Sequence, residues 1–229
     1  MEAIFKIILY THIAAGSISL ILFWIPVLVK KGSKVHNKIG MVYVYFMWIV
    51  VISAGILCCL NLFRGRPISA AFLGFLTLLT GHPLWYAIVV LKYKKEVPKR
   101  IYTIRKVMNW TLFVAGFGLI TWSMILKLNG PSVLLLIFGI LGVVSAFPLI
   151  RQKEASRMNS NWLAEHLEGM VGTGIAAYTA FLAFGGGNFF ADIFSGPLIA
   201  IPWSLPTIIG VIVITRMKKK MGFQLKFGK

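Results

Sequence analysis

A histidine stands between two carboxylates just ahead of one of the apolar stretches of the chain. His166 lies between Glu165 and Glu168, and the whole chain has only six Asp and Glu residues. A carboxylate that holds an imidazole in position allows the ring to bind a metal ion or to move protons. The pattern therefore predicts a candidate metal or proton site composed of His166, Glu165 and Glu168.

The same three residues have a purely structural interpretation. Acidic side chains in the first turn of a helix are stabilised by its positive end, and Asn161 is a residue type that caps helices well. This interpretation requires no ligand. The sequence leaves both interpretations open.

All four histidines of the chain lie within or beside apolar stretches. Ionisable residues at membrane depth are costly and are therefore functional candidates. We expect His12 and His82 in the middle or outer part of the membrane, and His36 and His166 near its inner surface. A low-spin haem takes one imidazole on each side of its iron, so two haems need four histidines, arranged as two pairs at two levels. Haem b, held by these four histidines in an electron-transfer or proton-transfer protein, is thus the leading functional hypothesis.

Two other functions fit the same histidines. A small solute or an ion could pass along a transport path lined by His12 and His82 that opens near the two carboxylates. Alternatively, the histidines form hydrogen bonds between helices in a non-catalytic membrane scaffold. The residue types do not discriminate among these hypotheses, and the solute or redox partner is not indicated.

The composition sets the class of protein. Of the 229 residues 58% are hydrophobic and 13% are charged, and the mean hydropathy is +0.83, whereas ordinary soluble domains have about 25% charged residues. Apolar runs of roughly 20 residues are long enough to cross about 30 Å of hydrocarbon. The sequence predicts one all-α membrane domain over residues 1–229, a polytopic bundle of seven transmembrane helices. The expected spans are about 5–29, 39–62, 68–91, 107–127, 131–150, 163–184 and 197–215.

The basic residues predict the orientation. Of the 24 Lys and Arg residues, all but Lys6, Arg64, Arg66 and Lys127 fall in the odd-numbered loops or in the C-terminal tail. Because basic loops stay on the cytoplasmic side, we expect the N-terminus outside and the C-terminus in the cytoplasm, with the protein in the inner (cytoplasmic) membrane.

The net charge of +18 does not indicate a nucleic-acid partner, because the basic residues are spread over short loops between apolar runs. Such loops favour contact with anionic lipids on the cytoplasmic side of the bilayer. Cys58 and Cys59 are neighbours in an apolar run and are expected to be packing residues.

Several short motifs carry a resemblance to a known family. Residues 11–17 read THIAAGS, Lys31-Gly32 is followed by His36, and Met170 follows His166 by one helical turn. In these motifs the chain resembles a family of bacterial multi-pass membrane proteins known only as a domain of unknown function. The resemblance implies that the four histidines matter as a set and that the protein lies in the cytoplasmic membrane, but it implies no reaction. A looser similarity to small b-type cytochrome membrane subunits rests on histidine placement alone.

Overall fold

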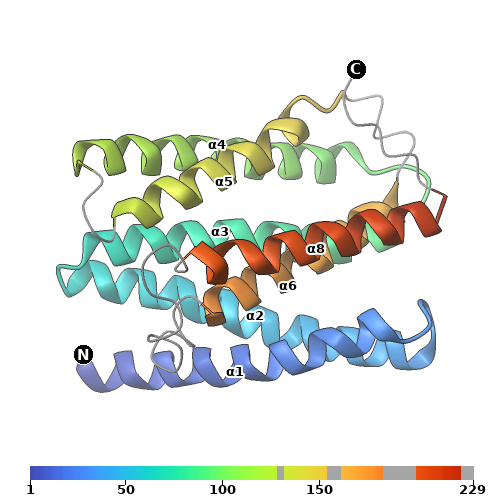
Figure 1. The fold of residues 1–229 in the computed structure, drawn as a ribbon, viewed down its shortest axis with the longest axis horizontal. Helices are drawn as coiled ribbons and strands as arrows, with labels where there is room; N and C mark the ends of the chain where they lie inside the picture. The colour runs from blue at the N-terminus through green and yellow to red at the C-terminus, as the bar shows by residue number, and fades with distance from the viewer. Residues whose placement is uncertain (128–131, 154–160, 183–199, 223–229) are drawn as a thin grey trace.

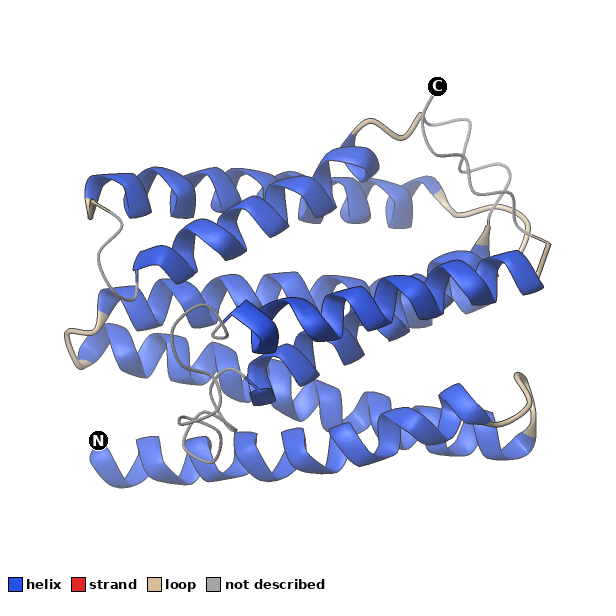
Figure 2. Cartoon of the chain, in the orientation of Figure 1, coloured by secondary structure: helices blue, strands red, loops and turns tan. Residues whose placement is uncertain are grey.

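The structure is a computed structural model that describes residues 1–127, 132–153, 161–182 and 200–222. These residues form α-helices joined by short connections and contain no strand (Figure 2). The helices are α1 (Glu2–Leu28), α2 (Lys34–Phe63), α3 (Pro67–Val89), the short 3-10 helix η1 (Val90–Lys92), α4 (Lys99–Ile125), α5 (Ser132–Ile150), α6 (Trp162–Ala180) and α8 (Ala200–Lys220).

Five of these helices, α1 to α5, are long and apolar enough to cross a membrane. Each of the seven expected spans overlaps one of the described α-helices, although residues 183–184 and 197–199 of the last two spans lie outside the described residues. The chain is therefore an all-helical bundle of the membrane class.

Successive helices of the bundle run in opposite directions (Figure 1). One end of the bundle thereby collects the α1–α2 turn, the α3–α4 connection, the start of α6 and the last turn of α8 (Figure 1). The expected first and third loops and the end of α8 lie here, and together they hold 15 of the 24 Lys and Arg residues. We call this the basic end of the bundle.

Two helices begin at least five residues before the expected span. α2 begins at Lys34 instead of residue 39, and α4 begins at Lys99 instead of residue 107. A hydropathy window stops at the first cluster of cations, whereas backbone hydrogen bonding continues a helix past the apolar segment. As a consequence, Arg105 lies on a helix rather than in a loop.

Close approaches between helices occur at glycines. A Cβ atom on Gly116 of α4 would lie 2.8 Å from the carbonyl oxygen of Gly139 on α5, and a Cβ atom on Gly169 of α6 would lie 2.6 Å from Cβ of Ala87 on α3. Small residues allow helix backbones to approach closely in a membrane. The second of these contacts lies one turn from His166 and helps to position the candidate site.

Candidate functional site at the basic end

A cavity of about 620 Å³ lies at the basic end between α1, α2, α6 and α8. Apolar side chains form most of its surface, and His36, His166 and Lys31 are among its polar members. Sites for small ligands and cofactors in proteins have this character, with volumes of about 300–1,000 Å³ and a few polar groups on an apolar wall. Two of the four predicted histidines therefore meet in one ligand-sized cavity.

The turn between α1 and α2 positions His36. Gly32 has a φ of +74°, which glycine adopts without the steric strain that other residues suffer. Ser33 then caps α2, and its Oγ accepts a hydrogen bond of 3.2 Å from the backbone N–H of His36. The His36 ring points back toward α1, and its Nδ1 lies 3.1 Å from the carbonyl oxygen of Pro26.

The crossing of α3 and α6 positions His166. Its Nδ1 lies 2.8 Å from the carbonyl oxygen of Ala87, which belongs to the last turn of α3. The close approach at Gly169 brings α6 near enough for this bond. The last four carbonyls of a helix have no partner within the helix, so both histidines donate to helix C-termini.

These contacts determine the tautomer of both rings. A backbone carbonyl only accepts, so Nδ1 of His36 and of His166 must carry the proton. In a neutral ring the Nε2 atom then has a free lone pair, and the described residues place no hydrogen-bond donor on it. Histidines that bind metals are held in this way, with the second ring nitrogen fixed by a carbonyl or carboxylate.

Lysines stand at the edge of the same cavity. Lys31 lines it and donates to the carbonyl oxygen of Pro26 at 2.7 Å. Partial burial, and next the positive charge of Lys220, lower the pKa of Lys31. An anionic group placed near these two amines would relieve their repulsion.

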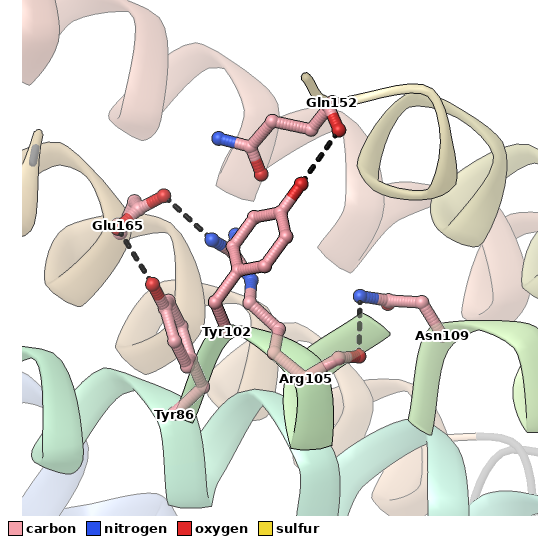
Figure 3. A network of polar contacts seen from close by, with 6 residues as sticks. All are labelled: Tyr86, Tyr102, Arg105, Asn109, Gln152 and Glu165. Carbon is pink, nitrogen blue, oxygen red and sulfur yellow. Dashed lines mark hydrogen bonds and ion pairs between the residues drawn. The ribbon is translucent and has the colours of Figure 1, made fainter. Parts of the chain in front are cut away.

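A buried ion pair lies beside the cavity (Figure 3). Nη1 of Arg105 lies 2.7 Å from Oε1 of Glu165, and Tyr86 donates to Oε2 of Glu165 at 3.1 Å. The guanidinium group also lies 3.8 Å from the centre of the Tyr86 ring, a distance at which a cation and an aromatic face attract each other. Residues from α3, α4 and α6 are joined in this way.

The network continues on both sides of Arg105 (Figure 3). Tyr102 donates to the backbone carbonyl of Gln152 at 2.7 Å, and Asn109 donates from Nδ2 to the backbone carbonyl of Arg105 at 2.9 Å. The Tyr102 contact ties the start of α4 to the end of α5, and the Asn109 contact carries the network one turn deeper into the bundle.

The three residues predicted as a metal site have different partners. Glu165 binds Arg105, Glu168 forms an ion pair with Lys218 of α8, and His166 donates to Ala87. Within the residues that the structure describes, no group of three or more His, Cys, Asp and Glu side chains could hold a metal ion. The structure thus does not bring His166, Glu165 and Glu168 together as ligands. The capping interpretation is also incomplete. Asn161 forms no side-chain cap for α6, and Glu165 in the first turn forms an ion pair with Arg105.

His12 and His82 do not line the cavity. Nδ1 of His12 lies 3.2 Å from the carbonyl oxygen of Val50 and 2.9 Å from Oγ of Ser53, so it joins α1 to α2. His82 is buried in α3, and no group in the described part of the chain forms a hydrogen bond with its Nε2. The two expected pairs of histidines therefore differ. His36 and His166 line one cavity, whereas His12 and His82 have separate surroundings.

Arg105 and Tyr86 were missed by the sequence reasoning, which counted Arg105 among the loop cations. A helical signal was present, because the buried face of α4 includes Tyr102, Arg105, Asn109 and Leu112 at spacings of three and four. Extending that period toward the N-terminus places Arg105 on the inward face.

Comparison of the chain with known protein families, with curated proteins and with solved structures finds no match. The resemblance seen in the sequence motifs therefore remains an expectation, and the function is argued from the site.

Proposed function

We propose that the protein binds haem b in the cavity at the basic end, where His36 and His166 would hold the iron, and that it serves electron transfer in the membrane. The observation that carries the proposal is that both rings line one cavity while Nδ1 of each lies at hydrogen-bond distance from a backbone carbonyl, which leaves Nε2 for a ligand. A bound haem b supplies a one-electron couple whose potential depends on its ligands and surroundings.

The lining of the cavity supports an amphipathic, flat ligand of this kind. Phe23, Val44, Ile88 and Met170 are among its apolar members, and they suit the macrocycle. Lys31 at its edge, with Lys220 nearby, suits the two carboxylates of the ligand. The two histidines come from different helices, α2 and α6, so each could contribute one nitrogen to an iron held in the cavity.

The contacts of Nδ1 with backbone carbonyls prepare both rings to bind a ligand through Nε2. Donation from Nδ1 to Ala87 or to Pro26 fixes the plane of the imidazole and raises the basicity of Nε2. The lone pairs are therefore oriented before any ligand arrives, which lowers the entropy that binding must overcome.

Absorption spectroscopy tests the proposal. We expect protein purified from haem-replete cells to show a Soret band, and to gain a sharp α band when dithionite is added. His36→Asn and His166→Asn are the matched variants, since the amide of asparagine can still donate near the position of Nδ1 but has no atom at the position of Nε2. Each should abolish the low-spin spectrum.

His12→Asn is the control, because its ring lies outside the cavity. It should retain the spectrum of the unmodified protein. A folded, colourless protein from haem-replete cells contradicts the proposal, and so does a low-spin spectrum that survives both cavity variants.

We also infer the placement of the bundle in the membrane. The segments richest in lysine and arginine lie at one end of the bundle (Figure 1). This supports a cytoplasmic basic end, an external N-terminus and residence in the inner membrane with all seven helices across it. Anionic lipid headgroups are the expected partners of the basic end.

A further inference from the structure

A pair of buried polar atoms without partners lies beyond the ion pair. His82 is 6% exposed and Asn109 is 1% exposed. Among the residues that the structure describes, neither Nε2 of His82 nor Oδ1 of Asn109 has a hydrogen-bond partner. Buried polar groups in proteins are nearly always satisfied, either by the chain or by ordered water. Two orphans in adjacent helices require an explanation.

The geometry of α3 and α4 places these two residues at one level. Arg105 of α4 stacks on Tyr86 of α3 at 3.8 Å, and the two helices run in opposite directions (Figure 1). His82 precedes Tyr86 by four residues and Asn109 follows Arg105 by four, so both lie about 6 Å deeper in the bundle at 1.5 Å per residue. Asn109 donates from Nδ2 to the backbone carbonyl of Arg105 and has no partner for Oδ1 among the described residues.

The chemistry of the two atoms indicates what lies between them. A direct bond from Nε2–H to Oδ1 would satisfy both, but none is formed. The positive charge of Arg105 disfavours a cation at this place, and an amide oxygen and an imidazole nitrogen offer little to an anion. A water molecule has two donors and two acceptors, and buried waters of this kind typically make about three hydrogen bonds.

We propose that His82 and Asn109 form a buried hydration site, in which ordered water bridges Nε2 of His82 to Oδ1 of Asn109. The site extends the polar network of Glu165 and Arg105 from the basic end toward the middle of the bundle. It gives the His82 ring a hydrogen-bonded contact with water at a depth where lipid would offer none. The inference stands independently of haem binding, since neither residue lines the cavity.

A double-mutant cycle tests the proposal, with His82→Leu, Asn109→Leu and the double variant followed by detergent-driven unfolding. If water bridges the pair, each single variant strands the other partner and raises the unfolding equilibrium constant about tenfold, and the double variant raises it by much less than the product of the two. If no water bridges the two atoms, each replacement removes an unsatisfied buried group. The single variants are then neutral or stabilising, and the double variant changes the unfolding equilibrium constant by the product of the two single changes.

Thr111→Leu is the control partner for the cycle. Thr111 is exposed on the same helix, and its hydroxyl donates to the carbonyl of Val107. Combined with His82→Leu it should give independent effects, because the two side chains share no partner.

A second measurement keeps the proposal testable if a leucine variant fails to fold. In the unmodified protein, magnetisation transfer from water to the side-chain amide of Asn109 should reveal a long-lived bound water. His82→Gln, which keeps a polar group near Nε2, should preserve this signal and His82→Leu should weaken it. A folded protein without the signal overturns the proposal, and so do neutral single variants with independent effects.

Discussion

Glu165 and Arg105 join α6 to α4 through an ion pair of 2.7 Å whose side chains are 14% and 9% exposed. Glu165 is the neighbour of His166, so the bond that fixes this carboxylate also fixes the first turn of α6 beside the cavity. Removing two charges from water is unfavourable, and such a pair persists when good geometry and further hydrogen bonds compensate. Here Tyr86 supplies both a hydroxyl donor and an aromatic face.

The first prediction concerns this pair. Arg105→Leu or Glu165→Leu should lower the free energy of unfolding by about 3–5 kcal/mol, because each leaves one buried charge without its partner. The double variant should be less destabilised than the two single changes added together. Unfolding in mixed detergent micelles measures all three.

The pair of Glu168 and Lys218 is the control. These side chains are 45% and 20% exposed, and exposed ion pairs contribute about 0–1 kcal/mol. Lys218→Ala should therefore change the free energy of unfolding by no more than this. Equal losses of unfolding free energy at the two pairs would show that burial does not strengthen the pair of Arg105 and Glu165.

The second prediction concerns the crossing of α3 and α6. A Cβ atom on Gly169 would lie 2.6 Å from Cβ of Ala87 and 2.8 Å from the carbonyl oxygen of Pro83, so Gly169→Ala must push the helices apart. We expect a loss of about 1–3 kcal/mol from this overpacking. The shift also draws His166 away from Ala87, so the proposed haem spectrum should weaken.

Gly172 of the same helix is a matched control, because a Cβ atom there meets nothing within 4 Å. Gly172→Ala should be neutral or should stabilise the helix by about 0.5–1 kcal/mol, since alanine loses less backbone entropy than glycine. The unfolding free energies of the two alanine variants are the measurement, and a similar loss in both would count against the close approach at Gly169.

The third prediction concerns α4 and α5. Gly116 and Gly139 face each other, and a Cβ atom on Gly116 would lie 2.8 Å from the carbonyl oxygen of Gly139. Gly116→Ala should destabilise the bundle by about 1–3 kcal/mol, whereas Gly118→Ala should not, because its Cβ would meet nothing within 4 Å. Thermal denaturation in detergent compares the two, and equal melting temperatures would contradict this packing.

The sequence predicted the helical class and the place of every described α-helix, because apolar runs report directly on burial in lipid or protein. It also placed His36 and His166 at one level, and the structure puts both on the wall of one cavity. This part of the site was accessible because loop charges determine which helix ends lie together.

Partners across helices were not accessible from the sequence. Nothing local distinguishes Glu165, which pairs with Arg105, from Glu168, which pairs with Lys218. These choices depend on which faces of α4, α6 and α8 meet, and small residues such as Gly169 decide that through tertiary packing. For this reason the sequence did not indicate that Glu165, Glu168 and His166 have three different partners.

The fourth prediction concerns His12. Its Nδ1 contacts with Val50 and Ser53 join α1 to α2, and hydrogen bonds between membrane helices contribute about 0.6 kcal/mol on average and at most about 1.7 kcal/mol. His12→Phe should destabilise the bundle within that range, as measured by unfolding in detergent. A loss of several kcal/mol would indicate that His12 does more than join two helices.

The fifth prediction concerns orientation. The α3–α4 connection belongs to the basic end and the α2–α3 turn to the opposite end (Figure 1). In a chain with Cys58 and Cys59 replaced by alanine, we introduce Lys95→Cys or Arg66→Cys, both at exposed positions. Because basic loops are retained in the cytoplasm, a membrane-impermeant thiol reagent should label residue 66 in intact spheroplasts and residue 95 only after permeabilisation. Arg66 makes no side-chain cap for α3, so the substitution should leave the helix start intact. The reverse labelling pattern would contradict the inferred orientation. It would place the proposed haem cavity and its lysines at the external face, away from the anionic lipids of the cytoplasmic leaflet.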